Sequence, residues 1–214
     1  MIDALAIIAY GIGTTVSVTV LSFLIGAVLA VPIAALRRAQ TPWISTIGTV
    51  IVEGVRSVPT LVWLFVIFYA VGADLVPLDT FQASVIGFSI ISAVYLAEVF
   101  RGALDAVPVG QWEASNALGM SRTPVMVRVV LPQAVLLTIP PSATYAIGLL
   151  KDTAAASIIG ATDITFYANQ TARTLGDPLV PFLVAAALYL LLSIPVAVAA
   201  RGSAHWIEKK LRTA

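Results

Sequence analysis

Five stretches of this chain contain no Asp, Glu, Lys or Arg, and their length restricts the folds that the chain can adopt. A transmembrane α-helix needs roughly 17 to 25 apolar residues, and each stretch approaches or exceeds that length. A transmembrane β-barrel would instead alternate apolar and polar residues, whereas the run LVWLFVIFYA is apolar on every face. The sequence therefore predicts an all-α membrane protein with five transmembrane helices, at residues 4–36, 57–73, 80–97, 129–150 and 178–200.

The sequence contains few residues that could act in catalysis or metal binding. Only 11% of the chain is charged, against roughly 25% in an average soluble protein. Cys is absent, which excludes disulfides and thiol chemistry and leaves the redox compartment open. The sequence contains no HExxH, GxSxG or phosphate-binding GxxxxGKS/T motif, and the single His205 is predicted to lie at the membrane interface beside Trp206. We expect no catalytic residue, metal site or bound cofactor in this chain, and no enzyme activity of its own.

The basic residues are unevenly distributed, which predicts the orientation in the membrane. Lys and Arg accumulate in cytoplasmic loops. With the N-terminus outside and the C-terminus inside, ten of the twelve basic residues are cytoplasmic, and only Lys151 and Arg173 are not. The ten are Arg37, Arg38, Arg56, Arg101, Arg122, Arg128, Arg201, Lys209, Lys210 and Arg212.

Residues 102–132 form the longest predicted cytoplasmic loop and indicate two short helices separated by a glycine. Pro108 and Gly110 turn the chain, and residues 111–118 have helical composition. Gly119 can adopt the left-handed conformation that ends a helix. The loop is therefore predicted to form a helix, a glycine turn and a second helix.

Prolines and small residues mark the neighbouring segments. Thr123 is typical of an N-cap, and the helix that follows it is predicted to be interrupted at Pro132. Residues 41–52 are too polar and too short to cross and indicate an interfacial helix. The fourth and fifth stretches contain prolines that mark either a broken helix at a cavity or a simple kink, and the sequence leaves both open. These prolines are Pro140, Pro141 and Pro195, while Gly26 and Ala30 are spaced for close helix packing.

The loop carries a recognisable signature. Glu113, Ala114 and Ser115 are followed by three residues, Gly119, nine residues, and the sequence VVLP, which ends in Leu131 and Pro132. This resembles the EAA loop of permease subunits of ATP-binding-cassette (ABC) importers, with Ser in place of the second Ala and Val in place of Ile. Three longer segments resemble the polar amino-acid branch of that family: VRSVPTLVWLFVIFYA, YLAEVFRGALDAVPVGQWEASNALG and LLKDTAAASIIGATDIT. In the last segment, Ala154 replaces the usual Ser.

The resemblance implies a fold, a set of partners and a role for the loop. It implies the type I ABC importer permease (MetI-like) fold in one transmembrane domain, residues 1–214, with the EAA loop at residues 102–132. The loop would form a coupling helix that docks on an ATPase subunit, where Glu113 meets a basic residue and Gly119 allows the turn. Trp112, Ala117 and Leu118 would bury apolar surface there. The ATPase-coupling residues would be Glu113, Ala114, Ser115, Gly119, Leu131 and Pro132.

The implied partners are two cytoplasmic ABC ATPase subunits, a second permease chain and an extracytoplasmic solute-binding protein. ATP and Mg²⁺ would bind to the ATPase subunits rather than to this chain. The second permease chain would be identical or closely related. The expected location is the bacterial cytoplasmic membrane, where the chain contacts the lipid bilayer and no nucleic acid.

Four residues are candidates for the substrate pathway: Glu98, Lys151, Asp152 and Thr153. Ionisable groups near a membrane are costly unless paired or hydrated, and they often mark pathways. The alternative is a structural ion pair, which for Glu98 would involve Arg101 one turn on. An autonomous channel or secondary transporter would also fit these residues, but neither this class nor a membrane enzyme explains the EAA spacing. The sequence leaves the transported solute open.

The orientation can be tested because the chain has no native Cys. A cysteine at position 177 (Asp177→Cys) should react with an impermeant thiol reagent added to sealed cells, and one at position 121 (Ser121→Cys) should not. Labelling at 121 with silence at 177 would reverse the predicted orientation.

Overall fold

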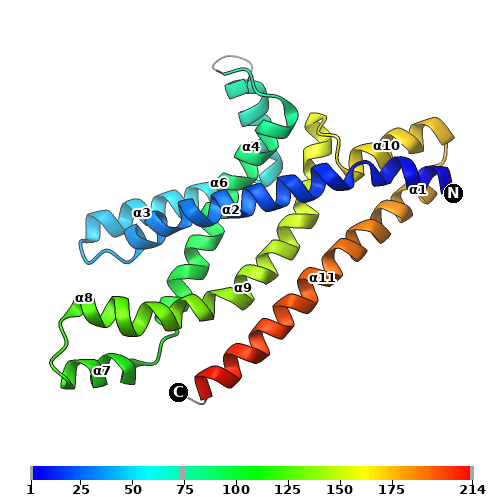
Figure 1. Ribbon diagram of the computed structural model, residues 1–214. Coiled ribbons are helices and arrows are strands. Elements are labelled where there is room, and N and C mark those ends of the chain that lie inside the picture. The colour runs from blue at the N-terminus through cyan, green and yellow to red at the C-terminus, as the bar shows by residue number, and fades with distance from the viewer. Residues whose placement is uncertain (1, 73–75, 213–214) are drawn as a thin grey trace.

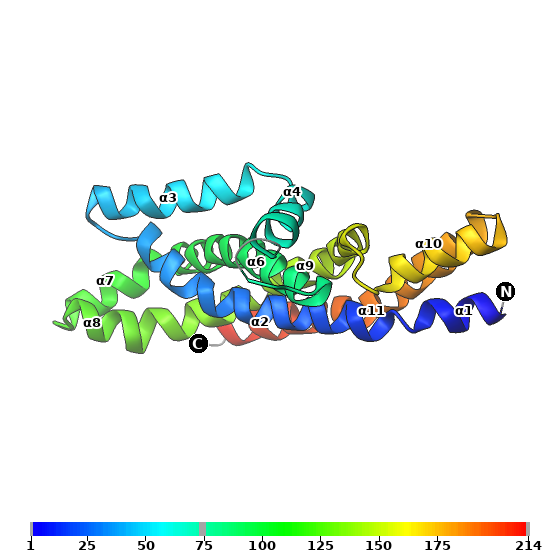
Figure 2. The same cartoon turned by 90° about the horizontal axis from the view of Figure 1, so that it is seen from above.

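The computed structural model describes residues 2–72 and 76–212, with side chains described for residues 3–72 and 76–203. All regular structure in these residues is helical, and long helices cross one another in an elongated arrangement (Figures 1 and 2). η1 and η2 are π-helical turns and η3 is a 3-10 helix. The elements are α1 (Ile2–Ala9), α2 (Ile12–Arg37), α3 (Pro42–Arg56), α4 (Thr60–Phe65), η1 (Val66–Val71), α6 (Thr80–Asp105), α7 (Val109–Ala117), α8 (Arg122–Pro124), η2 (Val125–Val130), α9 (Leu131–Asp152), η3 (Thr153–Ile159), α10 (Ile164–Leu175) and α11 (Leu179–Arg212).

Local sequence sets several of these boundaries. The carboxylate of Asp79 accepts a hydrogen bond from the N–H of Gln82 at 2.7 Å, and the Gln82 side chain accepts one from the N–H of Asp79 at 3.1 Å. This reciprocal capping satisfies donors that the first turn of α6 leaves unpaired. The Asp163 carboxylate caps α10 by accepting a hydrogen bond from the N–H of Phe166, without a reciprocal bond, and Gly176, with a φ of +68°, ends the helix. Short polar residues and glycine thus begin and end the helices where helix chemistry requires them.

The contact between α2 and α6 is the most extensive helix contact in the described residues. A Cβ atom added to Gly26 would overlap with the Cβ of Ser92, so the two helices approach too closely for any side chain there. Ala30 is fully buried one turn further on. The hydroxyl of Ser22 donates to the carbonyl oxygen of Val85 at 3.2 Å. The small residues at helix-packing spacing, Gly26 and Ala30, therefore lie in this contact.

Four helical segments are long and apolar enough to cross a membrane, and they correspond to the first, third, fourth and fifth predicted spans. The first is divided into α1 and α2 by a turn at Tyr10 and Gly11. A Cβ on Gly11 would overlap with the backbone of Asp163, so this glycine allows the turn to pack against the start of α10. The four segments are Asp3–Arg37, Thr80–Asp105, Arg122–Ile159 and Leu179–Ser203.

The second predicted span, residues 57–73, is shorter in the structure. α4 and η1 together cover residues 60–71, and Ala73 lies outside the described residues. The segment predicted as interfacial, residues 41–52, forms most of α3, which meets the α4–η1 helix at 93°. Pro59 accounts for the bend, because proline lacks an N–H and disfavours helical conformation in the residue before it. The described residues hold four spans, or five if this bent pair crosses as one.

The prediction that Pro132 interrupts a helix was wrong, and so was the predicted N-cap. The helical segment begins at Arg122 with Ser121 as the N-cap residue, two positions before Thr123, and it runs without a break to Ile159. In an α-helix the ring of a proline clashes with the carbonyl group four residues back. Here the π-helical turn η2 directly precedes α9, and its wider spacing accommodates the ring.

The other prolines do not end their helices either. Pro140 and Pro141 lie within α9, and Pro195 lies within α11. Among the open alternatives, a broken helix is therefore excluded at these three positions. At its end α9 continues as the 3-10 helix η3. Gly160, with a φ of +92°, ends η3.

Several helix ends lie toward one of two poles (Figure 1). The C-terminal end of α2, the loop with α7 and α8, and the C-terminal end of α11 lie toward one pole, and the N-terminus and α10 lie toward the other. Arg37, Arg38, Arg101, Arg122 and Arg128 belong to the first pole. This is the side that the orientation prediction takes as cytoplasmic, and the orientation itself stays a prediction. The side chains of Lys209, Lys210 and Arg212, like that of His205, lie outside the described residues.

Replacing Gly26 by Val should disrupt the contact between α2 and α6, because the new Cβ has no room against Ser92. Overpacking of this kind costs about 1–3 kcal/mol, so the melting temperature of the purified protein should fall. Gly13→Val is the matched control, because a Cβ at Gly13 on the same helix meets nothing within 4 Å. Equal melting temperatures for the two variants would contradict the close approach.

Candidate functional site

α7 lies in the predicted cytoplasmic loop and ends at a left-handed glycine. Gly119 has a φ of +72°. Its N–H donates to the carbonyl oxygen of Asn116 at 2.9 Å, and the N–H of Met120 donates to that of Ser115 at 3.1 Å. This pair of bonds is the Schellman motif, which satisfies carbonyl groups at a helix end. A Cβ on Gly119 would meet nothing within 4 Å, so backbone conformation, not space, requires the glycine. The predicted helix, glycine, helix pattern is confirmed.

One side of α7 packs against its own chain. Trp112 is partly buried against a cluster that includes Val107 and Val125. Ser115 is 4% exposed, and its hydroxyl donates to the carbonyl oxygen of Gln111 at 2.7 Å. Trp112 therefore packs part of its ring on its own chain, and burial of the rest on a partner stays a prediction. The small side chain at 115 allows α7 to lie against the helix that follows.

The other side of α7 is exposed, and we call it the outer face of α7. Leu118 and Val109 are 80% and 69% exposed, although both are large and apolar. Glu113, Ala114 and Ala117 are exposed as well. The outer face thus combines apolar residues with one carboxylate.

Leu131 and Pro132, the end of the EAA-like signature, begin α9 and are exposed. The side-chain amide of Gln133 donates to the side-chain oxygen of Gln111 at 3.2 Å and to the carbonyl oxygen of Val129 at 2.9 Å. The first of these bonds ties α7 to the start of α9. The signature residues therefore belong to one connected unit of α7, its glycine turn and the base of a long helix.

Glu98 lies in an ion-pair network at the loop pole, which we call the charge network and which consists of Arg37, Arg38, Glu98, Arg101 and Asp105. The Glu98 carboxylate lies 2.9 Å from Nε of Arg37, without hydrogen-bond alignment, and 3.0 Å from Nη2 of Arg101. Asp105 pairs with Arg101 at 2.8 Å and also with Arg38. The network joins α2 to α6. It matches the alternative of a structural ion pair, and a role for Glu98 in the substrate pathway stays a prediction.

The other three pathway candidates lie at the far end of α9. Lys151 and Asp152 are exposed, whereas Thr153 is 1% exposed and donates its hydroxyl hydrogen to the carbonyl oxygen of Leu150 at 2.7 Å. α6 ends and α9 begins at the loop, so Glu98, near the end of α6, is separated from Asp152 by most of the length of α9. The structure does not bring the four candidates together in one chain.

An aromatic cluster at the crossing of four helices was missed by sequence reasoning. The ring of Tyr145 on α9 stacks with that of Tyr95 on α6, with 5.5 Å between centroids, and lies 6.5 Å from that of Phe23 on α2. Its hydroxyl oxygen lies 2.9 Å from that of Ser92, and the Arg56 guanidinium lies 5.1 Å from the centroid of Tyr95. Tyrosines inside apolar stretches were the only signal. The cluster ties the four helices together through stacking and cation–π contacts.

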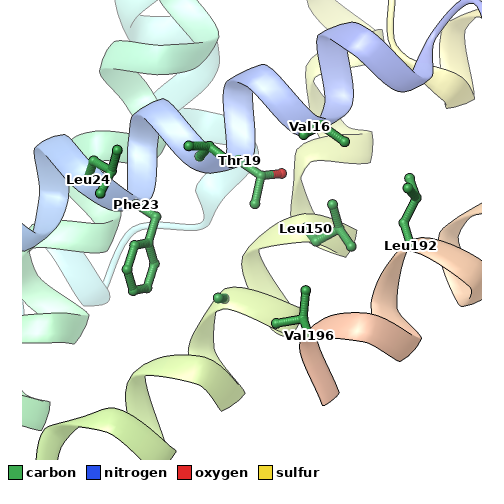
Figure 3. A pocket seen from close by; sticks show the side chains of 9 residues that line it. Val16, Thr19, Phe23, Leu24, Leu150, Leu192 and Val196 are labelled. Carbon is green, nitrogen blue, oxygen red and sulfur yellow. The ribbon is translucent and has the colours of Figure 1, made fainter. Parts of the chain in front are cut away.

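An apolar groove lies between α2, α9 and α11 (Figure 3). Its volume is about 350 Å³. The only polar side chain in it, Thr19, donates its hydroxyl hydrogen to the carbonyl oxygen of Thr15 at 2.7 Å. The groove therefore offers no free side-chain hydrogen-bond donor to a polar solute. Its lining residues are Val16, Thr19, Val20, Phe23, Leu24, Ala146, Leu150, Leu192 and Val196.

Polar residues gather beyond this groove, and we call Thr15, Asp163, Thr165 and Tyr189 the Asp163 cluster. Thr15 lies one turn before Thr19 on α2, and Tyr189 lies one turn before the groove residue Leu192 on α11. Asp163 is 1% exposed and accepts hydrogen bonds from the N–H of Phe166 at 2.7 Å and the hydroxyl of Tyr189 at 3.3 Å. Burial raises the pKa of Asp163 to about 7, although these hydrogen bonds act against that rise.

The described side chains include no group of three or more His, Cys, Asp or Glu residues that could hold a metal ion. The arrangement that remains is an exposed loop helix at one pole, a charge network beside it, and a long helix that leads from the loop to Lys151 and Asp152.

Comparisons with known proteins match this arrangement to one family. Residues 22–213 match the family described as binding-protein-dependent transport system inner membrane component. The chain is 36% identical over 206 residues to the L-cystine transport system permease protein TcyB of Bacillus subtilis, which covers 96% of this chain and 86% of TcyB. It is 31% identical over 211 residues to the arginine ABC transporter permease protein ArtQ of Escherichia coli, covering 87% of this chain and 89% of ArtQ.

Solved structures show the same fold. A crystal structure of an amino acid ABC transporter with histidines has a TM-score of 0.88 to this chain at 27% identity, covering 94% of each chain. An inward-facing MetNI methionine ABC transporter has a TM-score of 0.79 at 20% identity, covering 94% of this chain and 96% of the other. The predicted MetI-like fold is confirmed, while the span count is four or five.

Asp163 should make stability depend on pH. Its pKa is raised in the fold from 3.8 to about 7, so the folded state binds more protons than the unfolded state between these values. Its stabilising contribution is therefore complete below about pH 4 and is lost as the pH rises through 7. Asp163→Asn keeps an oxygen that can cap α10 but carries no charge. This variant should melt at a higher temperature than the parent at pH 8 and should show a smaller difference between pH 5 and pH 8.

Thermal unfolding of the purified protein at both pH values checks this expectation. Asp163→Ala, which removes the cap, should lower the melting temperature at both. Identical pH dependence in the parent and in Asp163→Asn would show that Asp163 does not titrate in this range.

Proposed function

Because this chain belongs to the family of binding-protein-dependent transport system inner membrane components, we propose that it is the permease subunit of an ABC importer that carries a polar amino acid across the bacterial cytoplasmic membrane. The similarity to an L-cystine permease over nearly the whole chain is the observation that carries this proposal. ArtQ and the solved amino acid transporter support the same solute class.

The chain works with partners. Two permease chains, identical or closely related, surround one translocation path, and two cytoplasmic ATPase subunits bind ATP and Mg²⁺. An extracytoplasmic solute-binding protein delivers the solute. The N-terminus lies outside and the C-terminus inside, an orientation supported by the gathering of Arg residues at the loop pole.

The outer face of α7 docks in a groove of the ATPase subunit. Its exposed Leu118 and Val109 leave apolar surface for a partner to bury. Glu113, exposed on the same helix, meets a basic residue of the ATPase. On the opposite side, the buried Ser115 and the partly buried Trp112 pack α7 on its own chain.

ATP binding draws the two ATPase subunits together and moves the docked loops with them. The path then switches from inward-facing to outward-facing, and hydrolysis resets it. Each ligand must bind one state better than the other for this switch to occur. Because the loop is tied to α9 by the Gln111–Gln133 hydrogen bond, movement of the loop reaches the helix that carries Lys151 and Asp152.

Reconstitution tests the function. Proteoliposomes containing this chain, its ATPase and its solute-binding protein should take up L-cystine or arginine only when ATP and both partners are present. Uptake without ATP would indicate an autonomous channel or secondary transporter instead.

Asp152 should affect the same uptake, because an exposed carboxylate near the end of α9 is placed to hold a polar solute. Asp152→Asn should raise the KM about tenfold, as expected for loss of a charge-assisted hydrogen bond of about 1.5 kcal/mol. Asp79→Asn, a change in an exposed helix-capping carboxylate, is the matched control. Unchanged KM values for every transported amino acid would remove Asp152 from the pathway.

Gly119→Leu and Glu113→Lys should each uncouple ATP hydrolysis from uptake or weaken ATPase binding. A residue with a side chain pays roughly 1 kcal/mol or more in the left-handed conformation of Gly119, and its bulk would project toward the partner. Gly102→Leu is the control, because Gly102 has open space and no positive φ.

Both variants should still insert into the membrane, and co-purification with the ATPase together with substrate-stimulated ATP hydrolysis measures the effect. Normal assembly and normal stimulation in both variants would show that the loop is not the coupling element.

A further inference from the structure

A second apolar groove lies at the loop pole, between α2, α6 and α9, with a volume of about 290 Å³. On α2 it is lined by Val31, Ala34, Ala35 and Arg38, at spacings of three, one and three residues. On α9 the residues at the same spacings are Leu131, Ala134, Val135 and Thr138. Such spacings place each set on one face of its helix. Two helical faces thus form the walls, and Phe100 and Leu104 of α6 complete the groove.

The groove is suited to hydrocarbon along its length. Val31, Leu131 and Val135 are 59%, 43% and 53% exposed, which is a large apolar exposure for one groove. Thr138 adds no free donor, because its hydroxyl donates to the carbonyl oxygen of Val135 at 2.7 Å. Arg38 is the only charged residue in the lining. The groove therefore has apolar walls and one cationic end.

The cationic end carries an excess of positive charge. The charge network sets three guanidinium groups, those of Arg37, Arg38 and Arg101, against two carboxylates. Arg38 donates a hydrogen bond from Nη1 to the carboxylate of Asp105. A guanidinium group has five N–H donors, so this bond occupies only one of them. One positive charge and several donors are left for an anion at the mouth of the groove.

The dimensions match one leaflet of a membrane. Val31 and Arg38 are seven residues apart, which is about 10 Å along an α-helix. Half of a hydrocarbon core is about 15 Å thick. With Arg38 at the end of a spanning helix, the groove extends from the headgroup region into the acyl region.

We infer that this groove binds one anionic phospholipid, with an acyl chain along the α2 and α9 walls and its phosphate at Arg38. The positive charge at Arg38 favours an anionic headgroup, and the apolar walls of the groove pack against the acyl chain. In the proposed orientation the lipid belongs to the cytoplasmic leaflet. Leu131, which resembles a residue of the EAA signature, lines this groove, so the lipid would contact the base of the coupling loop.

Native mass spectrometry of the full chain, purified with its ATPase, tests the site with phosphatidylglycerol and phosphatidylcholine as probes. The parent protein should bind phosphatidylglycerol about fivefold more tightly, the ratio expected for one additional basic contact. Arg38→Gln should remove this preference. Ala35→Trp should reduce binding of both lipids, because Ala35 is exposed in the groove and a large side chain fills it.

Two control variants assign these effects to the groove and to the Arg38 charge. Leu29→Trp introduces the same side chain at an exposed position of α2 that does not line the groove, and lipid binding should stay at the parent level. Asp105→Asn breaks the same ion pair as Arg38→Gln but keeps Arg38, so the preference for phosphatidylglycerol should remain.

Unchanged lipid binding in both Arg38→Gln and Ala35→Trp would overturn the proposal. So would loss of the ATPase or of a second permease chain from the Ala35→Trp complex with lipid binding intact, because the groove would then belong to a protein partner. None of these outcomes depends on which solute is transported.

Discussion

The close approach of α2 and α6 supports the rest of this fold. Helices in a bilayer gain little from the hydrophobic effect when they associate, since lipid tails are as apolar as leucine, so packing and hydrogen bonds must hold them together. Gly26 and Ala30 let the two backbones approach, and Ser22 adds a hydrogen bond across the contact. The main core, with Phe88 and Leu149, packs onto this pair.

Polar groups occupy the two poles, and the surface between them is largely apolar. At one pole the charge network joins α2 to α6, and at the other the Asp163 cluster joins α2, α10 and α11. Hydroxyl groups between them, such as those of Thr19 and Ser89, donate to carbonyl groups of their own helices. These hydroxyl groups therefore have partners nearby, as a medium without water requires.

Short-range chemistry was predicted well from the sequence. Uncharged stretches located four membrane-crossing segments, and Gly119 was predicted to end a helix in the left-handed conformation, which its φ confirms. Predictions failed where the structure at a residue depends on the segments next to it or packed against it. Pro132 was expected to end a helix, but the π-helical turn before it absorbs the ring. The residue pattern also could not show that Trp112 packs partly against its own chain, because that depends on where α7 folds back.

The candidate site was harder to predict than the fold. The loop residues lie close together in sequence, so their spacing carried the signature, whereas the substrate-pathway candidates were chosen one by one for their charge. Glu98 proved to have partners in Arg37 and Arg101, and only Arg101 lies within a turn of it in sequence. The contact between Tyr95 and Tyr145 joins residues fifty positions apart, which no local pattern reveals.

The helix from Arg122 to Ile159 is continuous but contains two points at which it can bend, the π-helical turn near its base and the pair Pro140 and Pro141 farther along. It has 38 residues and would span about 57 Å as an ideal α-helix, enough to reach from one membrane face to the other. A movement of the loop can therefore reach the far end of the helix as bending at these points, and the helix need not move as one rigid body. The π-helical turn lies within the first nine residues, so bending there would move most of the helix, whereas bending at Pro140 and Pro141 would move only the part beyond them, which carries Lys151 and Asp152.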